Sequence, residues 1–172
     1  RFPYNSGLQV CIVAAFPEKF RHLAPKDYAV GARSGRLIGF VDLAPTMLSL
    51  AGVKPPAFYQ GQAFAGPFET QPRAYSFGFR GRMDERYDLM RTVRDQRYVY
   101  IRNYHPHRIY GQHIAYMWAT PTTAVWDRLY REGKLKPPQT YFWETKPPEE
   151  LYDLQTDRDE VANLASSPEH KS

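Results

Sequence analysis

An uninterrupted apolar run, VCIVAAF, extends from Val10 to Phe16. Apolar runs without alternating polar positions are typical of strands that are covered on both faces, as in the parallel sheet of an α/β protein. The run therefore predicts a strand over residues 10–16 that belongs to a larger α/β sheet.

The next pattern predicts a helix over about residues 43–51. Asp42 is a residue type that caps helices, Pro45 lies in the first turn, where its missing N–H costs little, and Gly52 follows the last turn. On this helix three residues are expected to face the core: Met47, Leu48 and Ala51.

Two runs in the second half of the chain alternate apolar and polar positions, as half-exposed strands do. They occupy residues 87–93 and 97–103, and only Arg94 to Gln96 separate them. Alternating runs joined by so few residues predict an antiparallel hairpin. An earlier run at residues 73–79 predicts a further strand.

The segment ELYDLQTDRDEVANLA, close to the C-terminus, joins a short strand pattern to a helical one. Asp157 is placed to cap a helix, and Glu160, three residues later, completes the pattern of a capping box. The segment therefore predicts a last strand at residues 150–154 and a terminal helix at about residues 158–165. In this interpretation its acidic residues are structural.

The 172 residues suffice for one domain or part of one, and they carry a formal charge of +5 with a pI near 9.3. A basic chain of this kind is expected to meet an anion: a nucleic acid, an acidic membrane face or a small anionic substrate. The single cysteine, Cys11, excludes an internal disulfide framework, and no apolar stretch approaches the roughly 20 residues of a membrane-spanning helix. The chain begins at Arg1 without a methionine, and we expect it to be a fragment of a longer protein.

Candidate metal ligands and nucleophiles are poorly spaced. His105, His107 and His113 could bind zinc, but the ring of Pro106 limits how the first two imidazoles converge, so we favour loop histidines. The acids near the C-terminus lack the glycine turn and the terminal glutamate of a calcium loop. No G-x-S-x-G elbow occurs, and Cys11 lies in an apolar run, where a structural thiol is expected. The sequence therefore predicts no self-contained catalytic centre and no metal site.

Arginine is the strongest remaining signal. Eight arginines lie close together, interleaved with tyrosines: Arg80, Arg82, Arg86, Arg91, Arg94, Arg97, Arg102 and Arg108. They could bind a single nucleic-acid strand, form the outer face of a solvated sheet, or hold the anionic group of a ligand. The segment RGRMDERYD, from Arg80 to Asp88, is the candidate for the last role. It mixes arginines with acids, which suits a sugar that carries both hydroxyls and an anion.

The order of four segments resembles the C-terminal part of a sulfatase of the arylsulfatase or heparan N-sulfatase type. The segments are YNSGLQVCIVAAFPEKF, SGRLIGFVDLAPTMLSLAGV, YDLMRTVRDQRYVYIRNYHP and EELYDLQTDRDEVANLA, which together span nearly the whole chain. The resemblance implies an alkaline-phosphatase-like α/β fold, with a large mixed sheet and a small antiparallel sheet packed by a terminal helix. Residues 1–72 would then end the large α/β domain, and residues 73–172 would form the C-terminal subdomain.

The resemblance also implies chemistry that this chain does not complete. Sulfatases hydrolyse sulfate esters or sulfamates with a formylglycine, made from Cys or Ser in a C/S-x-P-S-R motif, and with a divalent cation, usually calcium. Both are expected upstream, because Cys11 is followed by IVAA and is not part of that motif. We therefore expect the parent to be a sulfatase that acts on a sugar, and the isolated chain to be inactive.

By the same resemblance, the chain contributes a wall of the substrate pocket. Arg1 is the nearest candidate for a basic residue that contacts the sulfate, and the other expected substrate-binding residues are Arg82, Asp84, Glu85 and Arg86. The expected partners are a sulfated small molecule or glycan and the upstream sulfatase domain, without a membrane or nucleic acid. The resemblance places the parent in a periplasmic, secreted or lysosomal-like compartment.

Two alternatives stay open at this point. One is a basic, aromatic-rich module that binds single-stranded nucleic acid or a polyanionic glycan, and the other is a phosphoryl-transferring member of the same superfold. A C/S-x-P-S-R motif upstream of Arg1 would favour the enzyme over the binding module.

Overall fold

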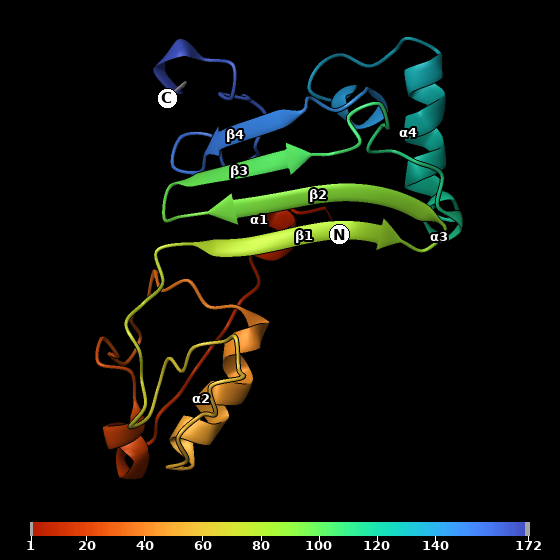
Figure 1. The fold of residues 1–172 in the computed structure, drawn as a ribbon. Helices are drawn as coiled ribbons and strands as arrows, with labels where there is room; N and C mark the ends of the chain where they lie inside the picture. The colour runs from red at the N-terminus through yellow and green to blue at the C-terminus, as the bar shows by residue number, and fades with distance from the viewer. Residues whose placement is uncertain (1, 171–172) are drawn as a thin grey trace. The chain divides into compact units, whose positions relative to one another are not determined.

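The computed structural model describes residues 2–170, which form two compact units (Figure 1). The first, here called the sheet unit, combines the segment up to Gln9 with the segment from Phe77 onward. The second, the loop unit, consists of Val10–Ser76. None of the described helices is both long and apolar enough to cross a membrane.

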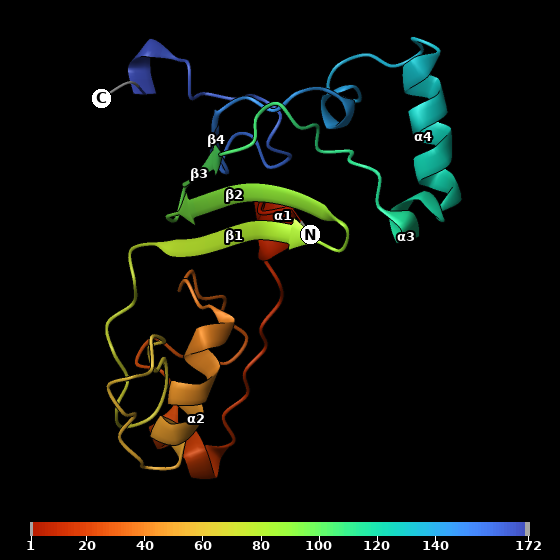
Figure 2. The ribbon, with the colours of Figure 1, turned by 45° about the vertical axis from the view of Figure 1, so that its right-hand side comes forward.

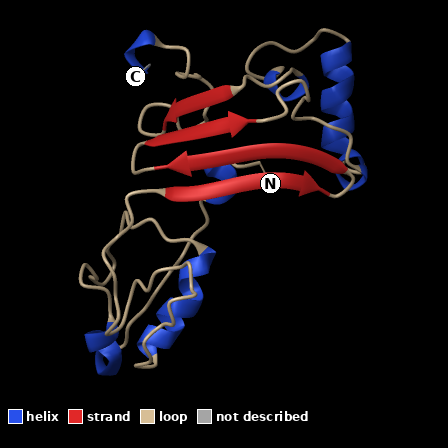
Figure 3. Cartoon of the chain, in the orientation of Figure 1, coloured by secondary structure: helices blue, strands red, loops and turns tan. Residues whose placement is uncertain are grey.

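A four-stranded antiparallel sheet forms the centre of the sheet unit (Figure 3). Its strands follow one another in chain order: β1 (Ser76–Met83), β2 (Arg86–Arg94), β3 (Tyr98–Asn103) and β4 (Glu149–Asp153). In the register of β3, Ile101 lies opposite Thr92 of β2 on one side and Glu150 of β4 on the other. The expected small antiparallel sheet and the hairpin over residues 87–103 are therefore confirmed, and β4 is an edge strand.

Short helices surround this sheet. They are α1 (Asn5–Leu8), α3 (Ala115–Trp118), α4 (Pro121–Arg131) and the 3-10 turns Tyr141–Trp143 and Pro168–His170. Helix α1 lies against β1 and β2 (Figures 1 and 2), and the close approach requires Gly78. A Cβ atom there would come within 2.6 Å of Leu8.

The core of the sheet unit follows the alternation along β2, β3 and β4. Its buried cluster consists of Met90, Val99, Ile101, Tyr110 and Tyr152. Alternate residues of a strand point to the same face, so a period of two gathers these side chains on one side of the sheet.

Glu150 lies inside this core with none of its surface exposed. Its carboxylate accepts hydrogen bonds from three tyrosine hydroxyls: Tyr4 at 2.6 Å, Tyr152 at 2.6 Å and Tyr110 at 2.7 Å. The side-chain amide of Asn103 donates a fourth at 2.5 Å. Burying a carboxylate is costly unless its oxygens are hydrogen-bonded, and these four donors offset that cost.

A second buried acid, Asp88 of β2, pairs with two cations. Lys146 lies 2.5 Å from its Oδ1 atom, and Arg80 lies 3.2 Å from its Oδ2 atom. Burial lowers the pKa of Lys146, and the hydrogen bond that Lys146 donates to Asp88 opposes that shift. The guanidinium of Arg80 also lies over the ring of Phe2, 4.1 Å from its centroid. Arg80 is therefore part of the core and not of a substrate loop.

Polar contacts organise the loop unit, which contains α2 (Leu43–Leu50) and the 3-10 turns Glu18–Leu23 and Phe40–Asp42. The Asp42 side chain makes no cap bond to α2. Instead its carboxylate accepts from the backbone N–H groups of Gly39 at 2.8 Å and Gln62 at 2.7 Å, and it pairs with Arg73. The helix lies where it was expected, but its orientation differs: Thr46 and Ser49 are buried while Met47 is 65% exposed.

The strand predicted over residues 10–16 is absent. This segment is irregular and most of its side chains are exposed, with Val13 at 94% and Cys11 also exposed. A strand needs hydrogen-bonded neighbours, and among the described residues this run pairs with none of the four strands.

The terminal helix predicted at about residues 158–165 is also absent, and turns replace it. Glu160 has a φ of 55°, in the left-handed region, which an α-helix does not accommodate. Asp157 still caps locally, because its carboxylate accepts from the N–H groups of Val161 at 2.9 Å and Ala162 at 2.8 Å. The capping interaction of Asp157 therefore forms, but a turn follows it instead of a helix.

Replacing Tyr152 by Phe should lower the free energy of unfolding by about 1–3 kcal/mol, because a buried carboxylate loses one of its donors. Chemical denaturation of the two proteins measures this difference. Tyr104→Phe is the matched control, since Tyr104 is 53% exposed. This variant should change the free energy of unfolding by less than about 0.5 kcal/mol. Equal losses in both variants would contradict the role given to Glu150.

The pair of Asp153 with Arg97 should make stability depend on pH at the acidic end. Hydrogen bonds from Arg97, the shortest at 2.6 Å, hold the pKa of Asp153 at about 2. The unfolded chain, with an aspartate pKa of about 3.9, binds more protons between these values, so stability should fall as pH drops through that window. Denaturation at a series of pH values should show a shallower fall for Asp153→Asn; an equal fall would rule the pair out.

Candidate functional site

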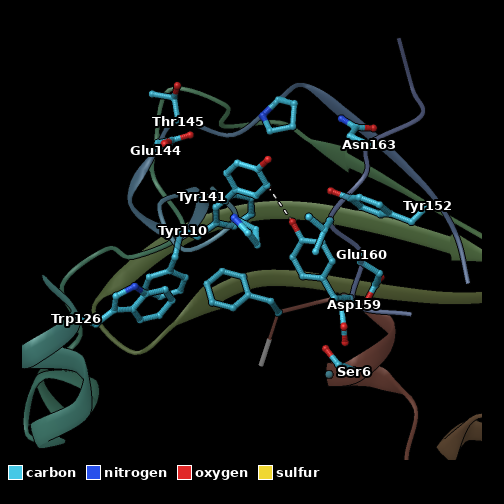
Figure 4. A pocket seen from close by; sticks show the side chains of 17 residues that line it. Ser6, Tyr110, Trp126, Tyr141, Glu144, Thr145, Tyr152, Asp159, Glu160 and Asn163 are labelled. Atoms are coloured by element: carbon cyan, nitrogen blue, oxygen red, sulfur yellow. Dashed lines mark hydrogen bonds between the residues drawn. The ribbon is translucent and has the colours of Figure 1, made fainter. Parts of the chain in front are cut away.

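A concave pocket of about 890 Å³ opens on the sheet unit (Figure 4). This volume lies within the range of roughly 300–1,000 Å³ that is usual for small-molecule sites. Segments far apart in the sequence line it, among them Phe2, Tyr110, Trp126, Phe142, Asp159 and Glu160. The pocket is therefore a product of the tertiary fold and not of any one motif.

One side of the pocket is aromatic. Trp126 of α4 and Phe142 of the 3-10 turn stack with their ring centroids 4.7 Å apart and their planes at 15°. Phe2 meets Phe142 edge-on at 5.9 Å, and the neighbouring Tyr141 is 42% exposed. The indole N–H of Trp126 donates to the carbonyl of Gln139 at 3.1 Å, which fixes the orientation of the ring.

The floor contains the three tyrosines whose hydroxyls bind Glu150. Burial, reinforced by the negative charge of Glu150, raises the pKa of Tyr4, Tyr110 and Tyr152. These hydroxyls stay protonated and are occupied by the acid behind them. The three tyrosines therefore contribute an uncharged surface to the lining of the pocket.

Three carboxylates also line the pocket, contributed by Glu144, Asp159 and Glu160. Figure 4 shows Asp159 and Glu160 beside Ser6, across the pocket from Trp126. No lysine, arginine or histidine lines the pocket among the described residues. In a chain whose formal charge is +5, this pocket is locally acidic.

Glu160 also fastens the N-terminal segment. Its carboxylate accepts from the backbone N–H of Asn5 at 3.0 and 2.9 Å, and hydrogen bonds from Asn5 and Ser6 oppose the rise in its pKa that burial causes. Glu160 was predicted to complete a capping box; it instead reaches a segment 155 positions earlier in the chain. Together with the bond from Tyr4 to Glu150, this contact fixes the wall formed by Tyr4, Ser6 and Gly7.

The predicted site residues of the Arg80–Asp88 segment lie in the β1–β2 hairpin, not in a loop that precedes a hairpin. Asp84 and Glu85 form its turn, with Asp84 at a φ of 45°. Glu85 accepts from the N–H of Ala115 at 2.9 Å, and backbone hydrogen bonds lower its pKa. Arg86 donates to the carbonyl of His113 at 2.6 Å.

The hairpin residues do not line the large pocket. Arg82, Asp84, Glu85 and Arg86 lie together at one end of the sheet, and Arg1 lies outside the described residues. Their role in substrate binding stays a prediction.

Several of the clustered arginines are paired with acids. Arg80 binds Asp88, Arg97 binds Asp153 at 2.6 Å, and Arg102 binds Glu149 at 2.5 Å. Such pairing reduces the free positive surface that a nucleic-acid strand would need. Among residues 2–170, no group of three His, Cys, Asp or Glu side chains could hold a metal ion.

Sequence reasoning missed the pocket and Glu150, the buried acid behind its three tyrosines. The aromatic side is assembled from distant segments, and no local pattern identifies it. Glu150 left a signal, since it shares a strand face with Tyr152 two residues later. An acid on the same face as a core tyrosine indicates a buried hydrogen-bonded group.

Comparison with curated proteins gives two related matches. An ulvan-active sulfatase of Formosa agariphila is 40% identical over 173 residues, which covers 100% of this chain and 28% of that protein. A second ulvan-active sulfatase of the same organism is 31% identical over 179 residues, covering 96% of this chain and 30% of that protein. The chain thus spans less than a third of the length of these relatives. No protein-family model matches it.

Among solved structures, similarity extends to a 2-O GAG sulfatase, with 24% identity, a TM-score of 0.45, and coverage of 74% of this chain and 20% of that chain. A structure in complex with D-glucosamine-2-N,6-O-disulfate as its substrate matches with 18% identity and a TM-score of 0.42, with the same coverage.

Glu160→Ala should lower the free energy of unfolding by about 1–3 kcal/mol and speed hydrogen exchange at the Asn5 amide, because that N–H loses its acceptor. Chemical denaturation and exchange measured by NMR test both effects. Asp159→Ala is the matched control. Asp159 is an exposed neighbour, and its replacement should change the free energy of unfolding by less than about 0.5 kcal/mol. Unchanged protection of Asn5 in Glu160→Ala would show that the contact does not hold the segment.

Proposed function

This chain belongs to the sulfatase family, as a homologue of its C-terminal part, and from this premise we propose that the whole protein removes sulfate from a sulfated polysaccharide. One observation carries the proposal: the 40% identity to an ulvan-active sulfatase extends over the full length of the chain. The reaction is hydrolysis of a sulfate ester or sulfamate, and the proposed substrate is a glycan of the ulvan type.

The residues of this chain do not provide the nucleophile or the metal of that reaction. The sequence contains no C/S-x-P-S-R motif, and residues 2–170 contain no cluster that fits a cation. We therefore assign formylglycine and calcium to the rest of the protein, and the isolated chain is inactive in this proposal.

The β1–β2 turn forms, in our proposal, a wall of the substrate cleft. The Nε atom of Arg82 donates to the carbonyl of Asp84 at 2.5 Å, and the Nε atom of Arg86 donates to His113. These contacts fix the planes of both guanidinium groups, whose remaining N–H groups suit sulfate or carboxylate oxygens. Asp84 and Glu85 supply acceptors for sugar hydroxyls.

The loop unit is proposed to pack on the upstream sulfatase domain. Its exposed apolar side chains support this role, including Val13 at 94%, Phe40 at 77% and Met47 at 65%. Large apolar patches on a protein surface mark contact with a partner. In this proposal Val10–Phe16 gains its strand neighbours from the upstream sheet.

The whole protein should release inorganic sulfate from ulvan, whereas the isolated 172-residue chain should release none. Ion chromatography of the released sulfate measures both, with chemically desulfated ulvan as the substrate control. Turnover by the isolated chain would contradict the assignment of the catalytic groups. Failure of the whole protein to release sulfate from ulvan, other sulfated glycans or an aryl sulfate would overturn the proposed function.

A further inference from the structure

We propose that the acidic, aromatic pocket of the sheet unit binds an uncharged sugar unit of the glycan. The inference rests on the proposed function, because it takes the ligand to be a sulfated polysaccharide. It assigns to this pocket the part of the substrate that carries no sulfate.

The aromatic side supplies the surface that a sugar ring needs. Trp126 and Phe142 stack in nearly parallel planes, at 15°, and form a two-ring aromatic stack whose outer face is the proposed surface for a sugar ring. The C–H groups of a pyranose carry slight positive charge and pack on the electron-rich face of such rings. Tyr141, which is 42% exposed, adds a further aromatic ring to the lining of the pocket.

The polar residues of the lining supply hydrogen-bond acceptors. Carboxylate oxygens accept but do not donate, so Glu144 and Asp159 suit the hydroxyl donors of a sugar. The hydroxyls of Ser6 and Thr145 add groups that both donate and accept. An apolar wall that faces convergent polar groups is the usual organisation of a small-molecule site.

The charge of the lining decides which sugar fits. Three carboxylates line the pocket, and among the described residues no cationic side chain does. A sulfate or uronate group would be repelled and would find no guanidinium or ammonium partner. The pocket therefore selects an unsulfated, neutral unit, while the sulfate is bound elsewhere in the protein.

The walls are fixed before a ligand arrives. Glu150 binds the hydroxyls of Tyr4, Tyr110 and Tyr152, and Glu160 binds the backbone of Asn5. A site that needs little ordering loses less affinity on binding. Glu150 thus supports the pocket from behind, and Glu160, which lines it, also fixes the N-terminal wall.

Kinetics of the whole protein on two substrates test this site. For Trp126→Ala and Tyr141→Ala, the ratio of kcat/KM on a sulfated ulvan oligosaccharide to kcat/KM on a small aryl sulfate should fall about tenfold, mainly through KM on the oligosaccharide. Tyr141 is exposed, so its variant keeps the test valid if Trp126→Ala does not fold. Tyr116→Ala, an exposed aromatic of α3 outside the pocket, is the matched control and should leave the ratio unchanged.

An unchanged ratio in both pocket variants, with an active wild type, would overturn the inference and leave the proposed function standing. A wild type that hydrolyses neither substrate would overturn the proposed function itself.

A charge reversal tests the selection against sulfate. Asp159→Lys should lower KM for a fully sulfated oligosaccharide relative to KM for a partly desulfated one, because an anion then meets a cation in the pocket. A ratio that stays the same or rises would contradict the exclusion of sulfate.

Discussion

The carboxylate of Glu150 is the interaction on which the sheet unit depends. It has no exposed surface, and a charge in that position is stable only while its donors stay in place. The donors come from four parts of the chain: Tyr4, Asn103, Tyr110 and Tyr152. One acid therefore ties the N-terminal segment, two strands and a long loop together, and the rings of its three tyrosines form the floor of the pocket.

Sequence patterns predicted correctly those elements that local periodicity specifies. The hairpin over residues 87–103 appears as expected, because alternation and a short connection are sufficient to specify it. The strand at residues 10–16 does not appear, since its stability depends on neighbouring strands and not on its own composition. The helix at 158–165 is lost because Glu160 adopts a left-handed conformation and binds Asn5.

The candidate site was less predictable for the same physical reason. The segment Arg80–Asp88 was noticed for its charges, yet Arg80 and Asp88 form a buried pair within the core. The pocket escaped notice because Trp126, Phe142 and Asp159 come together only through tertiary packing. Local patterns indicate elements, whereas a site built from five distant segments requires the folded chain.

The family assignment and the pocket together suggest that different parts of the protein bind different units of the glycan. In the proposed function the upstream domain carries the reaction, and the proposed role of the acidic pocket is to hold a neutral sugar of the same glycan. A crystal structure of the whole protein with a sulfated oligosaccharide, its nucleophile inactivated, tests this most directly. The account predicts an unsulfated sugar ring stacked on Trp126 and Phe142, with its hydroxyls towards Asp159. A sulfate group in that pocket, or a protein segment filling it, would contradict the account.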